Sequence, residues 1–139
     1  MRILIVNDDG IRASQMLPRA RWAKKLGTVT VVAPKVEQSG KSQGIELHEP
    51  FEVKAVELEE GIEAYAVDST PADCIRYAVL GLGRTFDLVI SGINRGFNMG
   101  TDIMYSGTAG AVMGSADTGT AKYVRRTIIS RNLLIHPPV

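Results

Sequence analysis

Cysteine and histidine are scarce in this 139-residue sequence, in which Cys74 is the only cysteine and His48 and His136 are the only histidines. A single cysteine excludes an internal disulfide and suits a reducing compartment. The sequence therefore lacks the His/Cys cluster that zinc favours, and neither histidine adjoins a segment that could form a serine–histidine–aspartate site. We interpret both histidines as surface or satisfied side chains, and Cys74, which falls in a helical pattern, as a small buried hydrophobe.

Charge of one sign and long apolar runs are also missing. Sixteen basic and fifteen acidic residues leave a net charge of +1, so no global field draws the chain to a nucleic acid polymer or a membrane. Any recognition of phosphate must be local. No apolar run approaches the roughly 18 residues of a transmembrane helix, and the N-terminus does not resemble a signal peptide. We expect a cytoplasmic protein with no nucleic acid or membrane partner.

The first ten residues carry the clearest positive signal. Residues 2–6 form a short apolar run rich in β-branched side chains, which is typical of a buried strand in a parallel sheet. The run stops at Asn-Asp-Asp-Gly, so Asp8 and Asp9 would lie beyond the carboxyl end of a strand, where open α/β sheets bind ligands. A divalent cation would offset the repulsion between the two carboxylates. The structural alternative is a turn in which Asp9 caps a helix.

The next segments predict a strand–helix–strand unit with parallel strands. A helix is expected from about Gln15 to Lys25, capped by Ser14, and residues 28–33 form the second strand. The polar segment 34–44, which contains Ser39, has the composition of a site loop. The apolar face expected for the helix is made of Leu17, Ala20, Trp22 and Ala23.

Further strands and one helix are predicted before residue 92. Residues 45–47 and 51–56 alternate as a half-exposed hairpin would, and 64–67 is a short strand candidate. Thr70 and Pro71 mark a helix start that runs to about Leu82, with Asp73 in a structural capping role. Residues 86–91 read as another buried strand.

A glycine-rich stretch follows, with five glycines between residues 92 and 110. Glycine lets backbone approach backbone, so that successive N–H groups can converge on an anion. Ser106 and Thr108 would stand at the start of a small-residue helix, where free N–H groups and the helix dipole favour phosphate. An ordinary Ser/Thr cap after a glycine-rich loop is the alternative.

These segments combine into one oxygen-rich site. Asp8 and Asp9 would follow one strand, Asn94 another, and Ser39 would come from the loop after the second strand. Four oxygen ligands completed by water suit one Mg²⁺ or Mn²⁺ ion. A metal beside a phosphate-binding helix start points to metal-assisted hydrolysis of a phosphate ester.

Five motifs in order then carry a family resemblance. They are Asn7-Asp8-Asp9-Gly10, Ala33-Pro34 with Ser39-Gly40, Thr70-Pro71-Ala72-Asp73-Cys74, Ser91-Gly92-Ile93-Asn94-Arg95-Gly96 and Tyr105-Ser106-Gly107-Thr108. Over roughly residues 1–117 the chain resembles the SurE (survival protein E) family of 5′/3′-nucleotidases and acid phosphatases, metal-dependent enzymes. The resemblance implies an α/β fold, a Rossmann-like three-layer sandwich with a mainly parallel sheet. It also implies hydrolysis of nucleoside monophosphates to nucleoside and phosphate.

The resemblance assigns roles by position. Asp8, Asp9, Ser39 and Asn94 match the family's metal ligands. Asn98, Ser106, Gly107 and Thr108 match the segment that holds the phosphate, with Asn94 beside it. We expect Asp8 or Asp9 to orient or deprotonate the attacking water, and Asn98, Ser106 and Thr108 to stabilise the phosphoryl oxygens.

The chain departs from the family pattern at three positions and in its length. Gln15 and Ser69 stand where the family usually has glycine, and Phe97 replaces a proline. Family members continue further, with more strands and an oligomerising arm. We expect a truncated SurE-like core at 1–118, a divergent tail at 119–139, and a homodimer or higher homo-oligomer.

Two alternatives to a nucleotidase stay open at this point. One is a receiver-like Mg²⁺-binding signalling module, although the strand at 86–91 is followed by Gly-Ile-Asn where a receiver needs an acceptor aspartate. The other is an inactive nucleotide-binding fragment.

Overall fold

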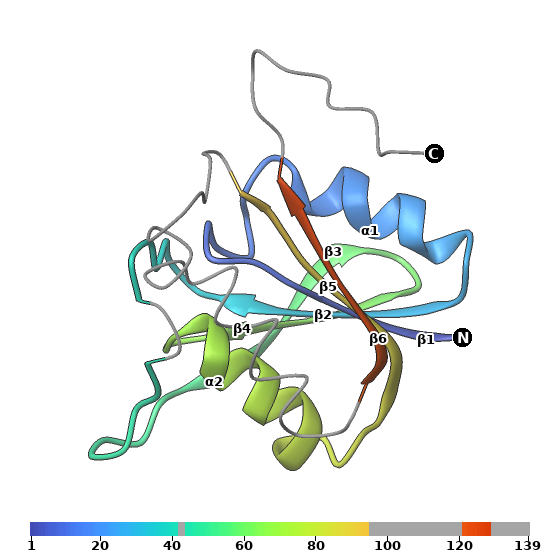
Figure 1. The fold of residues 1–139 in the computed structure, drawn as a ribbon. Helices are drawn as coiled ribbons and strands as arrows, with labels where there is room; N and C mark the ends of the chain where they lie inside the picture. Colours follow the sequence, from blue (N-terminus) through green and yellow to red (C-terminus); the bar gives the residue numbers. More distant parts are fainter. Residues whose placement is uncertain (42–43, 95–120, 129–139) are drawn as a thin grey trace.

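A six-stranded sheet with helices on both faces forms the structure, a computed structural model that describes residues 1–41, 44–94 and 121–128 (Figure 1). The strand order is β3-β4-β2-β1-β5-β6. In this order each pair of neighbouring strands is parallel, except β3 and β4, which are antiparallel. This confirms the expected α/β fold with a mainly parallel sheet. The elements are β1 (Arg2–Val6), α1 (Met16–Lys24), β2 (Thr28–Pro34), β3 (Val53–Glu59), β4 (Ile62–Val67), α2 (Pro71–Arg76), the π-helical turn η1 (Tyr77–Gly81), β5 (Phe86–Asn94) and β6 (Ala121–Ile128).

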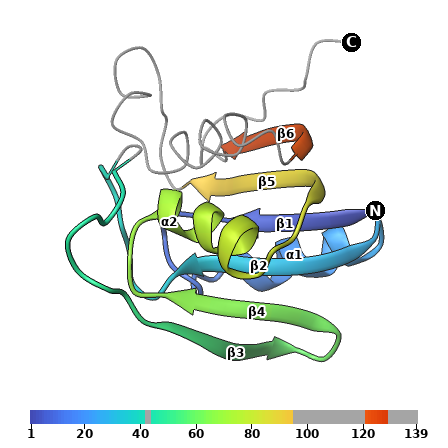
Figure 2. The same ribbon diagram turned by 90° about the horizontal axis from the view of Figure 1, so that it is seen from below.

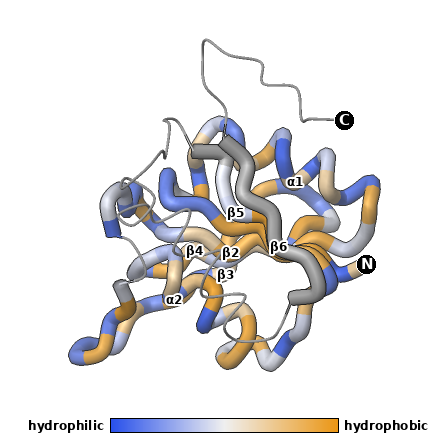
Figure 3. The backbone as a smooth tube through the Cα atoms, in the orientation of Figure 1, coloured by the Kyte–Doolittle hydropathy of each residue, from blue (hydrophilic) through white to orange (hydrophobic). Residues whose placement is uncertain are grey.

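The core has two apolar layers, one on each face of the sheet. Ile3 and Ile5 of β1 belong to the layer that packs against α1, and Leu4 and Val6 belong to the layer against α2. Successive side chains of a strand point to opposite faces, so an uninterrupted apolar run can supply both layers. Figure 2 shows the two helices on opposite sides of the sheet, and Figure 3 shows the apolar central strands between them. The strand predicted at 2–6 is confirmed in type and extent.

Helix α1 differs in detail from the prediction. Its buried residues are Met16, Ala20 and Ala23, spaced by four and three, whereas Trp22 is 50% exposed. At 100° per residue Trp22 falls away from that stripe, so its assignment to the apolar face was wrong. The cap was also wrong, because Gln15 is the N-cap residue and the Ser14 hydroxyl donates to the Gln15 side chain.

The hairpin lies later in the chain than predicted. β3 pairs with β4 and not with residues 45–47, which form no strand and expose Leu47. The connection is a tight turn at Gly61, whose positive φ of 76° suits glycine. Alternation in residues 51–56 identified a strand but could not identify its partner.

The start of α2 matches the prediction closely. Thr70 caps the helix by accepting the Asp73 N–H at 3.2 Å. Asp73 is fully buried and accepts from the Ser69 hydroxyl and from the Glu46 backbone N–H at 2.8 Å. The structural role expected for Asp73 is confirmed and extended, because it also fastens the segment before β3. Cys74 is fully buried, and burial raises the pKa of its thiol well above the usual value.

None of the helices in the described part of the chain is long and apolar enough to cross a membrane.

Candidate functional site

The carboxyl ends of β1 and β5 meet at the point where the order of connection along the sheet reverses. From β1 the chain proceeds to β2 on one side, and β5 returns on the other side of β1. Val6 is in register with Ser91, so Asp8 and Asp9, which follow β1, lie at the same end of the parallel strands as Asn94, the last residue of β5. Open α/β sheets bind ligands in the crevice at such a switch point. The backbone therefore brings together three of the predicted site residues.

A buried asparagine builds the turn that presents the acidic pair. The Asn7 side chain donates to the Gly10 carbonyl at 2.9 Å and accepts the Gly10 N–H at 3.2 Å. Gly10 has φ 101°, which favours glycine at this position. Asn7 therefore forms the turn. The sequence pattern did not show that its role differs from that of the two acids that follow it. Asp8 is 3% exposed and Asp9 is half-buried.

The loop after β2 is fastened to this turn. The Ile11 N–H donates to the Pro34 carbonyl at 2.8 Å, and the Gln38 N–H donates to the Asp8 carbonyl at 2.7 Å. Ser39, the next residue, is exposed, and its hydroxyl donates to Glu37 Oε1 at 2.7 Å. The structure thus brings the predicted site loop to Asp8. The backbone amide of Gln38, which makes this connection, leaves no signal in the sequence.

Gln15 makes a contact with Asp9 that the sequence reasoning also missed. Gln15 Nε2 donates to Asp9 Oδ2, and the Gln15 side chain makes no capping bond to its own helix. Asp9 is not the N-cap of α1 either, so the simple capping alternative for Asp9 is wrong. One hint of this contact was in the sequence, because Gln15 stands where the family that the chain resembles usually has glycine.

The side chain of Asn94 and residues Asn98, Ser106, Gly107 and Thr108 lie outside the residues whose side chains the structure describes. Among the described residues no group of three or more His, Cys, Asp or Glu could hold a metal ion. The proposed donor set has only two carboxylates, which are adjacent, and its other oxygens come from serine and asparagine. Such hard oxygen donors fit Mg²⁺ or Mn²⁺ and do not fit zinc.

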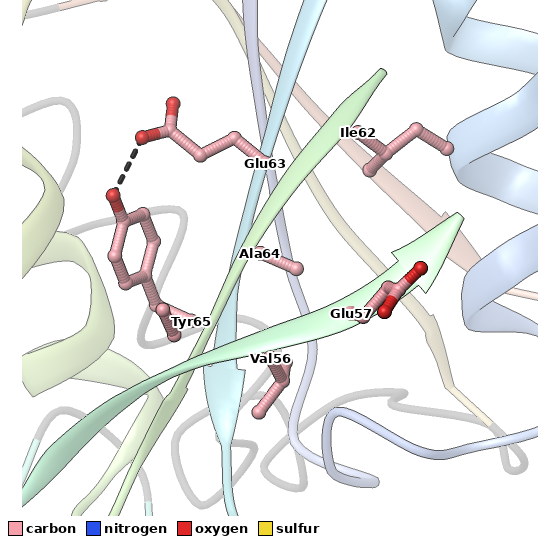
Figure 4. Close-up of a pocket in the computed structure, with 7 residues that line it drawn as sticks. Val56, Glu57, Ile62, Glu63, Ala64 and Tyr65 are labelled. Carbon is pink, nitrogen blue, oxygen red and sulfur yellow. Dashed lines mark hydrogen bonds between the residues drawn. The ribbon is translucent and has the colours of Figure 1, made fainter. Parts of the chain in front are cut away.

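A separate pocket lies on the β3–β4 hairpin (Figure 4). The Tyr65 hydroxyl donates to Glu63, and Glu63 also pairs with Arg84. The hydrogen bond from Arg84, followed by that from Tyr65, lowers the pKa of Glu63. Ile62 and Glu63 begin β4, so the pocket lies toward the amino end of that strand and away from the switch point. Its lining residues are Ala55, Val56, Glu57, Ile62, Glu63, Ala64 and Tyr65.

A mainly parallel sheet with an acidic pair and a polar loop at its switch point defines a Rossmann-like α/β protein with a candidate site rich in oxygen atoms. Residues 3–122 match the family model described as "Survival protein SurE". The chain therefore belongs to the SurE family.

Individual relatives agree with this assignment. The chain is 45% identical over 120 residues to "5'-nucleotidase SurE" of Thermoanaerobacter sp. (strain X514). The matching segment covers 86% of this chain and 48% of that protein. It is also 45% identical to "5'-nucleotidase SurE" of Thermosipho melanesiensis, with 86% of this chain and 47% of that protein covered. The crystal structure of SurE protein from Aquifex aeolicus superposes with a TM-score of 0.77 at 33% identity, covering 96% of this chain and 54% of the other. The chain spans about half the length of the curated relatives it matches.

Proposed function

We propose that this chain carries the catalytic site of a divalent-metal-dependent nucleotidase. The reaction is hydrolysis of the 5′- or 3′-phosphate ester of a nucleoside monophosphate, which yields nucleoside and phosphate. The observation that carries the proposal is the acidic pair Asp8–Asp9 at the switch point, with the Ser39 loop fastened to Asp8 by a 2.7 Å hydrogen bond. The relatives named 5'-nucleotidase SurE support the same activity.

Four residues would hold the ion in this proposal. Asp8 and Asp9 supply the negative charge, and Ser39 and Asn94 supply neutral oxygens, a donor set that suits one Mg²⁺ or Mn²⁺. Ser39 follows the anchored Gln38, and its hydroxyl, which here donates to Glu37 Oε1, would have to exchange that partner for the ion. When bound, the ion supplies Lewis-acid polarisation of the ester phosphate and lowers the pKa of coordinated water.

The chain's own residues then have distinct tasks. Asp8 or Asp9 orients the attacking water or accepts its proton. Asn98, Ser106 and Thr108, with the Gly107 N–H and Asn94, stabilise the charge that develops on the phosphoryl oxygens. The two hydrogen bonds between Asn7 and Gly10 fix the backbone of the turn that carries the two carboxylates.

One measurement tests the proposal. Phosphate release from a 5′- and a 3′-nucleoside monophosphate is followed with added Mn²⁺ or Mg²⁺, then after chelation and again after the metal is restored. We expect release that chelation abolishes and metal restores. Nucleotide binding without any release would favour the inactive fragment instead. Membership of the SurE family removes the support for a receiver-like module.

A further inference from the structure

Gln15 stands between the start of α1 and the acidic turn. Its backbone is fixed as the N-cap residue of the helix, where its carbonyl accepts the Arg19 N–H at 3.3 Å. Its side chain leaves the helix and donates from Nε2 to Asp9 Oδ2. Both side chains are half-buried, so the hydrogen bond is partly shielded from competing water.

The Asp9 carboxylate determines which end of the Gln15 amide faces it, because an ionised carboxylate can only accept hydrogen bonds. The Ser14 hydroxyl donates to Gln15 Oε1 at 3.2 Å, which leaves Nε2 for the carboxylate. Rotation of the amide by 180° would place Oε1 against Asp9 Oδ2, two acceptors with no proton between them. Asp9 therefore fixes the orientation of the Gln15 amide, and the Ser14 hydroxyl adds a hydrogen bond to its other end.

We propose that Gln15 is a positioning residue that holds the Asp9 carboxylate in place to receive a divalent cation. This inference rests on the proposed function, because it takes Asp9 to be a metal ligand. With Oδ2 held by the amide, the carboxylate loses less rotational freedom when the ion binds.

Hydrogen-bond partners of metal ligands have a measurable effect on affinity. Removing one such partner typically weakens metal binding by about 10–100-fold, because the ligand must then be ordered when the ion arrives. A residue at position 15 without a side-chain N–H could not donate this bond.

Titration calorimetry of the full chain with Mn²⁺ alone, without nucleotide, tests the inference. Gln15→Met keeps the length and helix propensity of the side chain but removes the donor, and Gln15→Ala is a second variant that removes it. We expect the Mn²⁺ Kd of both variants to rise by about 10–100-fold. Lys25→Met introduces the same side chain at the exposed far end of α1 and should leave the Kd unchanged.

The melting temperature in chelator separates positioning from a general structural role. We expect it to be equal in wild type and Gln15→Met, so that only the stabilisation by added Mn²⁺ differs. If wild type binds Mn²⁺ and both variants stay within about threefold of its Kd, the role of Gln15 is refuted while the proposed function stands. A drop in the chelated melting temperature that accounts for the loss of affinity would equally refute it. Absence of Mn²⁺ binding by the wild type would remove the proposed metal site itself.

Discussion

Asp8 and Asp9 are adjacent in sequence but occupy different environments. Asp8 is 3% exposed and its backbone carbonyl anchors the loop that carries Ser39. Asp9 is half-buried and accepts from Gln15. A carboxylate that is almost removed from water is costly unless charge or hydrogen bonds compensate it, and a bound cation adds such compensation. The two acids of the proposed site therefore have different surroundings.

Replacing either acid should abolish metal-dependent hydrolysis without unfolding the chain. Asp8→Asn or Asp9→Asn removes one of the two charges of the proposed site, and we expect phosphate release to fall by ~10²-fold or more at saturating Mn²⁺. Initial rates across a Mn²⁺ titration measure this effect. Near-wild-type turnover in either asparagine variant would show that the acidic pair only forms a turn.

Replacing Ser39 should have a smaller effect. Ser39→Ala removes only a neutral oxygen, so its activity should be partly restored by excess Mn²⁺, and the same titration of initial rates measures this.

Strands were easier to predict than the contacts between elements. The β-branched runs at 2–6, 28–33 and 86–91 follow directly from what a buried parallel strand requires, and all three became strands of the sheet. The hairpin was misplaced because local alternation does not choose a partner strand. Similarly, the contact between Gln15 and Asp9 depends on how α1 leaves the turn, which is a tertiary property.

The start of α2 offers a test at the level of one element. Asp73 accepts from the hydroxyls of Ser69 and Thr70, which precede it by four and three residues, from Arg76 in the following turn and from the distant Glu46 N–H. Asp73→Asn keeps the shape of the side chain but gives up charge and one acceptor, which leaves buried donors short of a partner. Because such a buried loss costs about 1–3 kcal/mol, we expect the free energy of unfolding in urea to fall by that amount.

A matched control for Asp73 lies nearby. Asp68 is 49% exposed and pairs with Lys35 at 3.3 Å, so Asp68→Asn removes a carboxylate that water already screens. Its effect should stay within about 0.5 kcal/mol. Equal losses in the two variants would mean that Asp73 contributes only through net charge and not through its buried hydrogen bonds.

At the scale of the molecule, the sheet includes residues that the sequence analysis assigned to a divergent tail. β6 (Ala121–Ile128) pairs in parallel with β5, with Leu88 opposite Tyr123 and Ser91 opposite Arg126. In the described part of the chain β6 is the last strand on this side of the sheet. Within the described residues one edge of β6 pairs with β5 and no strand pairs with its other edge, where a further strand could add backbone hydrogen bonds.

This arrangement leads to a prediction for assembly. We expect the full chain to be a homodimer whose contacts include residues after about Lys122, because two copies can pair their β6 edges by symmetry. Size-exclusion chromatography with light scattering at micromolar concentration measures the mass.

A shortened chain that ends at Gly119 lacks β6 and exposes the edge of β5, next to the strand end that carries Asn94. The shortened chain should lose the discrete dimer and either aggregate or melt at a lower temperature. Well-folded monomers of both lengths, with equal melting temperatures, would show that β6 neither stabilises the sheet nor joins two copies, and that residues 1–119 are sufficient for the fold.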